Sequence, residues 1–155
     1  MDKQREDMAR VITGLRRCFQ LLATVSDEMI RDLGLTAALR AMLEHLSQAG
    51  PQTVPQVARE KSVKRQSIQE LVDQLRERGL VETMENPAHR RSGLIKLTRN
   101  GQQLFKEVQR REAAELKNFV KLFDRGDLAA TADSLEVLRN ALQTRREGDI
   151  ENVGN

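Results

Sequence analysis

The chain contains no tryptophan or tyrosine, and only one cysteine and three prolines among its 155 residues. Because four phenylalanines are its only large aromatic side chains, the core must consist mainly of Leu, Val, Ile and Met. One cysteine cannot form an internal disulfide, which is typical of a reducing compartment. No apolar run approaches the roughly 20 residues that a membrane-spanning helix needs. The start, MDKQREDMAR, is too polar for a secretory signal, so we expect a cytoplasmic protein that does not contact a membrane.

Residues that could carry chemistry are few and scattered. His45 and His89 are isolated from each other and from Cys18, and no spacing typical of a zinc site occurs. The sequence has no glycine-rich phosphate loop, nucleophile elbow or metal-ligand motif. We therefore predict that the chain is not an enzyme and that it holds neither a cofactor nor a metal ion.

Positive charge is concentrated in residues 53–101. The whole chain carries a net charge of +3, whereas this stretch has ten Lys and Arg against six Asp and Glu, a net of +4. A local excess of positive charge is typical of a surface that binds nucleic acid, because it attracts phosphate groups. The charge pattern therefore favours nucleic acid as the partner.

Apolar residues recur three and four positions apart over most of the chain, which predicts amphipathic helices. The first would cover residues 4–32 and be about 40 Å long, more than a small domain requires. Such a helix usually packs on a partner, most often a second copy of the chain. Gly34 would end it, and Thr36 would cap the next helix, which Gly50-Pro51 would end. Two further helices are expected at residues 55–61 and 64–78.

Two short strands are expected after these helices. Residues 80–84 and 94–97 have the composition of strands, and the nine-residue loop between them is rich in turn formers. Helix, turn, helix and a hairpin with a basic tip, in that order, predict a winged helix-turn-helix, an α+β and mainly α-helical fold. This fold presents one helix and one hairpin to duplex DNA.

The sequence divides into four parts. Thr98 would cap another long helix, and residues 124–127 would separate it from a last amphipathic helix. The expected parts are an N-terminal dimerisation helix at residues 1–34, the winged helix-turn-helix at 35–101, C-terminal dimerisation helices at 102–146 and a flexible tail at 147–155.

Residues 78–101 contain a specific pattern. RGLV at residues 78–81 is followed by an NP-x-x-RR wing at residues 86–91 and by LT-x-x-G at residues 97–101. In this order and spacing they resemble the multiple-antibiotic-resistance-regulator (MarR) family of bacterial transcription factors. The flanking helices match that family in placement rather than in residues. The other matching segments are Leu35-Thr36, Thr53-Val54, Val57-Ala58, residues 63–68 and residues 71–75.

The resemblance implies properties that composition does not show. The chain would form a homodimer in which the first helix and the last two helices of each copy interlock. The dimer would bind a palindromic operator in double-stranded DNA, and a small-molecule or redox signal would weaken that binding. The implied function is a sequence-specific transcriptional regulator that acts as a repressor.

Two groups of residues are expected to contact DNA. The start of the 64–78 helix would enter the major groove, where Gln pairs with adenine and Arg with guanine, and wing arginines would enter the narrow minor groove. In a dimer, the two recognition helices would lie roughly 34 Å apart. The plainer alternatives are a solvated helix end and solubilising charge at a turn. The expected DNA-binding residues are Lys64, Arg65, Gln66, Ser67 and Gln69 on the helix and Arg90 and Arg91 in the wing.

Two positions depart from the family pattern. The wing usually has an Asp before its Arg pair, where an ion pair orients an arginine, but His89 stands there in this chain. On the recognition helix, Gln69-Glu70 replaces the Thr and basic residue that are more frequent in the family. A glutamate can accept from a cytosine amino group. These departures concern the rigidity of the wing and the operator sequence, and leave the expected fold unchanged.

The sequence leaves the nature of a signal open. An apolar lining from Met29, Ile30, Met42 and Phe105 would suit a small aromatic or amphipathic effector, but the same residues would serve equally as core.

A redox signal would require a reactive Cys18. Some family members sense peroxide through a first-helix cysteine that tyrosines activate, and this chain has no tyrosine. A reactive thiol also needs positive charge nearby, and Arg16 and Arg17 do not share a helix face with Cys18. We expect Cys18 to be buried and inert at a helix interface.

Two other functions are compatible with a winged helix. One is a module for protein–protein contact alone, against which the basic wing arginines argue. The other is an architectural DNA-binding protein without sequence preference. Steep salt dependence of DNA binding would exclude the first, and a large ratio of specific to non-specific affinity would exclude the second.

Overall fold

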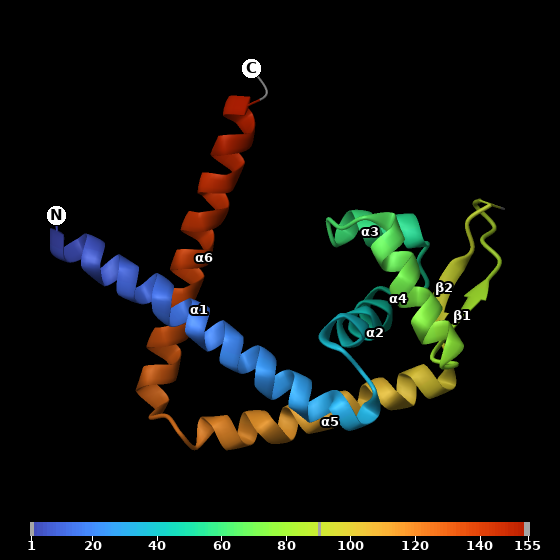
Figure 1. The fold of residues 1–155 in the computed structure, drawn as a ribbon, viewed down its shortest axis with the longest axis horizontal. Helices are drawn as coiled ribbons and strands as arrows, with labels where there is room; N and C mark the ends of the chain where they lie inside the picture. Colours follow the sequence, from blue (N-terminus) through green and yellow to red (C-terminus); the bar gives the residue numbers. More distant parts are fainter. Residues whose placement is uncertain (1, 90, 154–155) are drawn as a thin grey trace. The chain divides into compact units, whose positions relative to one another are not determined.

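The structure is a computed structural model that describes residues 2–89 and 91–153, with the backbone alone for Arg125 and residues 146–153. The chain divides into two units at residue 112, within its fifth α-helix. None of the described helices has the length and apolar character that a membrane span requires. The elements are α1 (Asp2–Ile30), the 3-10 helix η1 (Arg31–Leu33), α2 (Ala37–Ala49), α3 (Val54–Glu60), α4 (Arg65–Glu77), β1 (Val81–Met84), β2 (Leu94–Leu97), α5 (Arg99–Val120) and α6 (Arg125–Val153) (Figure 1).

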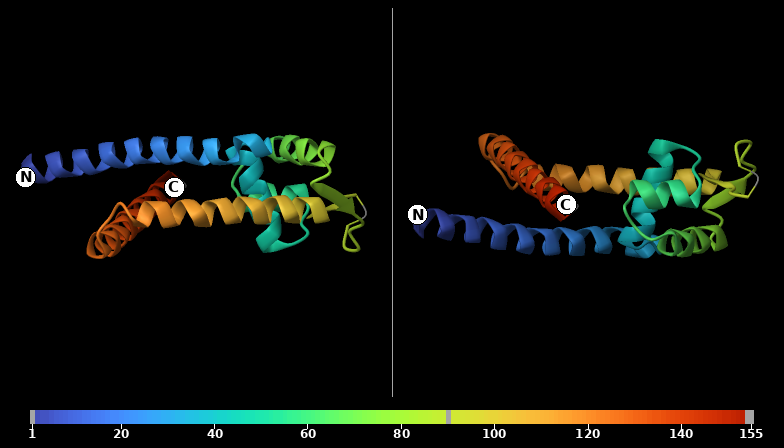
Figure 2. Two further views of the ribbon diagram at one scale, coloured as in Figure 1. Left: turned by 90° about the horizontal axis from the view of Figure 1, so that it is seen from below. Right: turned by 90° about the horizontal axis from the view of Figure 1, so that it is seen from above.

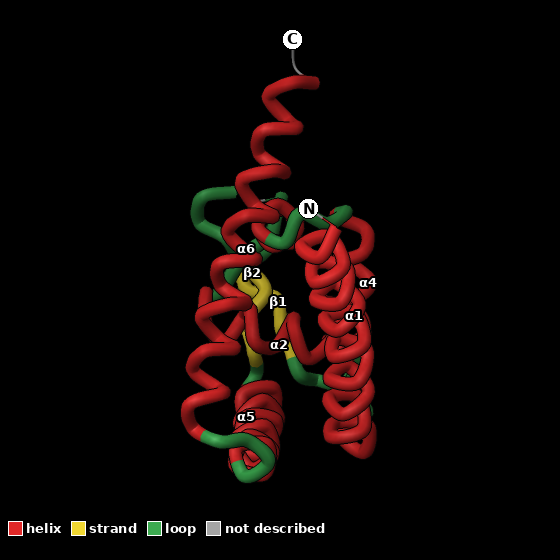
Figure 3. The backbone as a smooth tube through the Cα atoms, turned by 90° about the vertical axis from the view of Figure 1, so that its left-hand side faces the viewer, coloured by secondary structure: helices red, strands yellow, loops and turns green. Residues whose placement is uncertain are grey.

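The predicted fold class is confirmed. The described chain is mainly helical, with one antiparallel pair of short strands (Figure 3). Within the first unit, the strands and their loop lie at one end and the N-terminus of α1 at the other (Figure 2). The predicted helix at residues 64–78 and both predicted strands lie within one residue of the observed bounds.

The break between the last two helices was predicted a few residues too late. The expectation was residues 124–127, but α5 ends at Val120 and α6 begins at Arg125. The N–H of Leu122 donates to the carbonyl of Phe119, which tightens the chain into a turn there. The carbonyl of Asp124 then accepts from the N–H of Asp127 and starts the next helix. The backbone of α6 continues to Val153, through the first part of the expected tail, and the flexibility of residues 147–155 stays a prediction.

The hydrophobic core of the first unit forms around α2. Its apolar residues Leu39, Met42, Leu43 and Leu46 follow an i, i+3, i+4, i+7 spacing, so they form one stripe, and all four are buried. Thr36 caps the helix, because its side-chain oxygen accepts from the N–H of Leu39 at 3.2 Å. The other buried core residues are Ile30, Leu35, Val57, Ala58, Ile68, Val72, Leu75, Leu80, Val81, Ile95, Leu97, Phe105 and Val108.

This core includes the residues that were considered as an effector pocket. Ile30, Met42 and Phe105 are buried within it, and the half-buried Met29 packs against it. In the single chain these four residues therefore serve as core, which was the alternative interpretation.

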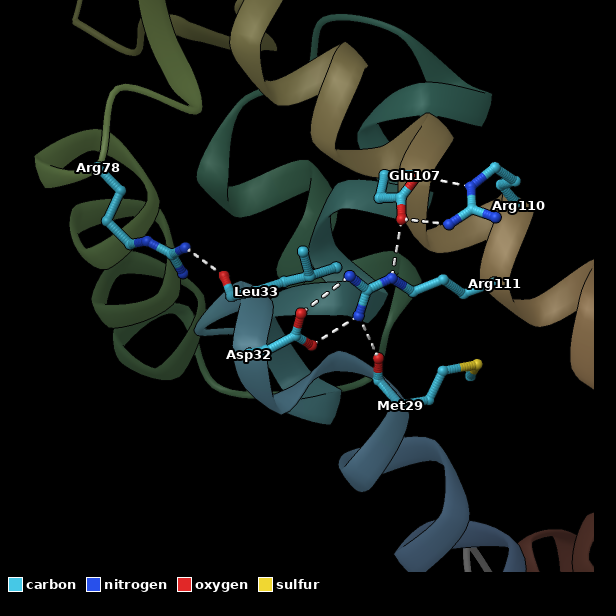
Figure 4. A network of polar contacts seen from close by, with 7 residues as sticks. All are labelled: Met29, Asp32, Leu33, Arg78, Glu107, Arg110 and Arg111. Atoms are coloured by element: carbon cyan, nitrogen blue, oxygen red, sulfur yellow. Dashed lines mark hydrogen bonds and ion pairs between the residues drawn. The ribbon is translucent and has the colours of Figure 1, made fainter.

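The segment that joins α1 to α2 is held by two arginines from other helices (Figure 4). Arg78, directly after α4, donates to the carbonyl oxygens of Gly34 at 2.7 Å and Leu33 at 2.8 Å. Arg111 of α5 donates to the carbonyl oxygen of Met29 at 2.8 Å and to Asp32 Oδ1 at 2.6 Å. Three of these four acceptors, those of Met29, Leu33 and Gly34, are backbone carbonyls near a helix end, where hydrogen bonds within the helix run out. The arginine side chains therefore supply partners that the helix itself cannot.

Close approach of backbone positions the wing against the core. Gly101, in the first turn of α5, faces the carbonyl of Leu80, and an added Cβ would lie 2.0 Å from that oxygen. The hydroxyl of Thr98 donates to the carbonyl of Gly79 at 2.6 Å and accepts from the N–H of Gly101 at 3.1 Å. Thr98 and Gly101 of the LT-x-x-G pattern thus join the start of α5 to the segment between α4 and β1.

Most of α1 is exposed in the single chain. Ile30 is the one side chain of α1 that is buried, and Phe19 is 74 % exposed. Cys18 is exposed as well, so its expected burial at a helix interface is wrong for the single chain. The reason is that α1 meets the core of the first unit only at its C-terminal end.

The arginine contacts predict an acid-sensitive contribution to stability. Hydrogen bonds from Arg110 and Arg111 lower the pKa of Glu107 from 4.5 to about 2, and a hydrogen bond from Arg111 lowers the pKa of Asp32. The folded chain therefore takes up protons less readily than the unfolded chain. This stabilisation is complete above about pH 4.5 and is lost as the pH falls toward about 2.

Arg111→Ala should reduce that dependence. The free energy of unfolding, measured in urea from pH 7 to pH 2.5, should fall less steeply below about pH 4.5 than in the wild type. The remaining slope reflects Arg110, which still contacts Glu107. Arg31→Ala, an exposed arginine of η1, serves as control and should keep the wild-type slope. Equal slopes for Arg111→Ala and the wild type would contradict the assignment.

Candidate nucleic-acid interface

Helices α3 and α4 form the helix-turn-helix. Thr53 caps α3 in a reciprocal box with Gln56, in which Gln56 Oε1 accepts from the N–H of Thr53 at 2.8 Å. In the turn, the N–H of Val63 donates to the carbonyl of Ala58 at 3.0 Å. The buried residues of both helices then direct the outer face of α4 to solvent.

The predicted contact residues at the start of α4 lie on that outer face. Lys64 is the N-cap residue, Arg65, Gln66 and Ser67 are exposed in the first turn, and Gln69 is half-buried. The first N–H groups of a helix have no partner within it, and the helix dipole favours a phosphate there. This end of α4 is therefore suited to an anionic backbone as well as to base edges.

A groove of about 380 Å³ lies between the start of α4, the start of α3 and the wing. Arg65, Gln66 and Gln69 line it from α4, and Arg91 lines it from the wing. Four of the seven predicted residues therefore surround one groove. Lys64 and Ser67 lie on the same helix but do not line it, and Arg90 lies outside the described residues.

The groove is rich in positive charge. Three arginines, Arg65, Arg76 and Arg91, line it, and none of its described lining residues carries a carboxylate. Such a surface attracts a polyanion, and arginine in particular suits both phosphate groups and a narrow minor groove.

Arg76 was missed at the sequence level. Its guanidinium donates to Asp73 Oδ1 at 2.9 Å and to Thr83 Oγ1 on β1 at 3.1 Å. It therefore connects the recognition helix to the wing. A possible signal was the spacing of Gln69, Asp73 and Arg76, which places the three side chains on one helix face. The partner on β1, however, is set by the tertiary packing.

The wing is held by an asparagine. Asn86 Nδ2 donates to the carbonyl of Ser92 at 3.0 Å, and Asn86 Oδ1 accepts from the N–H of Ala88 at 3.1 Å. The side chain of His89, which stands where the family usually has Asp, is exposed. Asn86 thus cross-links the two sides of the loop.

The strands below this loop are in regular register. Val81 pairs with Leu97, and Glu82 pairs with Lys96, whose side chains form an ion pair at 3.0 Å. On the other side of β2, Gln52 and Ile95 exchange backbone hydrogen bonds of 3.1 and 2.7 Å. The wing is therefore attached both to α4 and to the segment before α3.

A helix-turn-helix, a two-stranded wing and a basic groove between them define the class of winged helix DNA-binding proteins. Residues 33–92 match the MarR family profile. The uncharacterised protein Rv2011c of Mycobacterium tuberculosis (strain H37Rv) is 31% identical over 141 residues, which cover 91% of this chain and 98% of that protein.

Solved structures of other proteins have the same fold. The MarR family transcription regulator SP03579 matches with a TM-score of 0.86 at 24% identity, over 95% of this chain and 97% of that chain. BpsR of Bordetella bronchiseptica, whose DNA binding is regulated by 6-hydroxynicotinic acid, matches with a TM-score of 0.68 at 23% identity, over 84% and 98%. The chain belongs to the MarR family of transcription regulators and is a DNA-binding regulator.

The wing contact is open to a direct test. Arg91→Ala should weaken binding to the operator at least about tenfold, because it removes a cation from the groove between wing and recognition helix. The affinity is measured by titration of labelled operator DNA at physiological salt, and sedimentation should show an unchanged association state. Arg31→Ala is the matched control, since it removes the same charge from η1 and should bind as the wild type does. Wild-type affinity of Arg91→Ala would exclude the contact.

Proposed function

We propose that the chain is a transcriptional repressor that binds a palindromic operator as a homodimer and is released by a small-molecule effector. The observation that carries the proposal is the single groove lined by Arg65, Gln66 and Gln69 of α4 and by Arg91 of the wing. In this arrangement the helix reaches base edges in the major groove, while the wing arginine reaches the flanking minor groove. Lys64, Ser67 and Arg90 complete the proposed contact set.

An apolar stripe on α1 supports the homodimer. Met8, Val11, Ile12, Phe19 and Leu22 are exposed and lie at positions i, i+3, i+4, i+11 and i+14, so they share one helix face. Exposed apolar surface of this extent usually marks a protein interface. A second copy of the chain would cover the stripe, and it would also cover Cys18, which lies beside Phe19.

The second unit, taken by itself, also exposes apolar side chains. Leu116 and Val120 lie on the last turns of α5, and Leu135, Val137 and Leu142 lie on α6. These surfaces support the division into terminal dimerisation regions, residues 1–34 and 102–146, around a DNA-binding module at 35–101. A two-fold symmetric dimer presents two identical recognition helices, and a palindrome is the DNA sequence that matches this symmetry.

Phe19→Glu should separate the dimer. The side chain is largely exposed in the single chain, so the substitution leaves the core intact but puts a charge into the proposed interface. We expect monomers in sedimentation velocity and a loss of operator affinity of at least about tenfold, because one half-site contact remains. Gln20→Glu adds the same charge at the next, exposed position and should stay dimeric. A dimeric Phe19→Glu protein would contradict the assignment of the interface to this stripe.

Mapping of protected sites on the source genome tests the whole proposal. We expect a palindrome with half-sites about 10 base pairs apart, and an affinity that falls steeply, by about 10³-fold or more, between 50 and 200 mM salt. Binding of similar strength to every sequence would instead support an architectural protein. Absence of DNA binding would support a module for protein–protein contact.

The proposed effector site is a second groove, of about 400 Å³, between α2, β2 and α5. Leu46, Leu97 and Phe105 contribute an apolar floor, and Lys106 contributes positive charge together with Lys96, which also pairs with Glu82. A small aromatic acid would place its ring on the floor and its carboxylate near the lysines. The regulation of BpsR by 6-hydroxynicotinic acid supports this chemical class.

A panel of small aromatic acids that includes 6-hydroxynicotinic acid tests this site. An effector should raise the melting temperature of the wild type, because it binds the folded chain, and should weaken operator binding. Lys106→Ala should lower the apparent affinity for the effector about fivefold or more, as measured by both effects. Lys117→Ala, at an exposed site farther along α5, should leave that affinity unchanged. The groove would be excluded as an aromatic-acid site if no acid in the panel both raised the melting temperature and weakened operator binding. It would also be excluded if Lys106→Ala and Lys117→Ala responded to the effector equally.

A further inference from the structure

Asp73 lies at the centre of a small polar network on the recognition helix. Its Oδ1 atom accepts from Gln69 Nε2 at 2.9 Å and from the guanidinium of Arg76 at 2.9 Å. The same guanidinium donates to Thr83 Oγ1 on β1 at 3.1 Å. Gln69, Arg76 and Thr83 all line the proposed DNA groove. A carboxylate next to the groove thus holds one of the residues that were predicted to read DNA.

The chemistry of this contact sets the orientation of the Gln69 amide. A carboxylate accepts hydrogen bonds and does not donate them, so the NH₂ group of Gln69 must be the end that faces Asp73. The amide oxygen Oε1 is then directed to the other side of the amide group. Among the described residues, none donates a hydrogen bond to this oxygen. It is therefore available as an acceptor for a ligand in the groove.

Asp73 is itself held in place. Arg76 binds the same oxygen atom as Gln69 and is in turn bound to the hydroxyl of Thr83. The chain of contacts therefore runs from the wing strand through Arg76 and Asp73 to Gln69. Asp73 and Arg76 are each about half exposed, so bound DNA would remove water from them and strengthen these hydrogen bonds.

We propose that Asp73 is a specificity-determining residue, which holds Gln69 as a hydrogen-bond acceptor for one exocyclic amino group of a base. In the major groove, adenine presents its N6 amino group and cytosine its N4 amino group, whereas guanine and thymine present carbonyl oxygens at the corresponding edge. Gln69 with its oxygen toward the bases accepts from the first two and meets an unfavourable oxygen–oxygen contact with the others. The inference rests on the proposed function, since it concerns operator DNA in the same groove.

A free glutamine would not make this distinction as well. Rotation of the amide by half a turn exchanges its donor and its acceptor, so the side chain alone can adapt to either kind of base edge. Contact with Asp73 opposes the rotated state, because the amide oxygen would then face a carboxylate oxygen. Asp73 therefore acts on specificity without having to touch the DNA.

The test is a double-mutant cycle on base preference. Wild type, Gln69→Ala, Asp73→Ala and the double variant are titrated against the operator found by genome mapping and against all single-base changes in its half-site. The position in the half-site at which Gln69→Ala no longer discriminates between bases is the base pair that Gln69 reads. Asp73→Ala should lower discrimination at that same position about tenfold, and should have no further effect in the Gln69→Ala background.

The control variant is Glu77→Ala. Glu77 is exposed on the same helix, so its removal changes the charge of α4 equally and should raise affinity for all sequences without changing the preference. A uniform change of affinity in Asp73→Ala, with discrimination as in the wild type, would overturn the inference. So would an equal loss of discrimination in both backgrounds, or a Gln69→Ala variant that keeps every preference. Wild-type protein without any base preference would instead overturn the proposed function itself.

Discussion

The hydrogen bonds to the segment between α1 and α2 are the constraint on which the arrangement of the first unit depends. Arg78, directly after the recognition helix, and Arg111 of α5 both donate to backbone carbonyls at the end of α1 and in the following turn (Figure 4). Because α1 carries the exposed apolar stripe and α4 carries the predicted DNA contacts, this junction joins the two surfaces of the proposed dimer. Its geometry sets the direction of α4 relative to α1, and therefore, in the proposed dimer, would set the separation of the two recognition helices.

The basic groove depends on a second set of local constraints. Gly101 permits α5 to begin against the carbonyl of Leu80, and Thr98 ties the same turn to Gly79. Because β2 leads directly into α5, these contacts fix where the wing leaves the core. Arg76 then joins α4 to β1. Arg91 and the start of α4 line a common groove as a result, although they are more than twenty residues apart in the sequence.

The two departures from the family pattern have different structural outcomes. At the wing, the amide of Asn86 cross-links the loop and the side chain of His89 is exposed. On α4, Gln69 is bound to Asp73, whereas Glu70 is exposed one position further along. Both changes leave the hydrophobic face of α4 intact, which explains why the fold is shared with solved structures that are 24% identical or less.

Hydrophobic periodicity and end signals by themselves determined the elements of residues 35–101, whereas the break between α5 and α6 was predicted a few residues too late. The stripe from Leu39 to Leu46 and the Thr36 cap predicted α2, because such signals act over one or two helical turns. RGLV, the wing pattern and LT-x-x-G, in their order and spacing, predicted the family. Tertiary structure alone decided which polar groups meet: Arg78 with Leu33, Arg111 with Asp32, and Arg76 with Thr83. It also decided that Met29, Ile30, Met42 and Phe105 pack as core and that Cys18 is exposed in the single chain. A long polar side chain can reach many partners, and only the packed backbone determines which of them lies within hydrogen-bond distance.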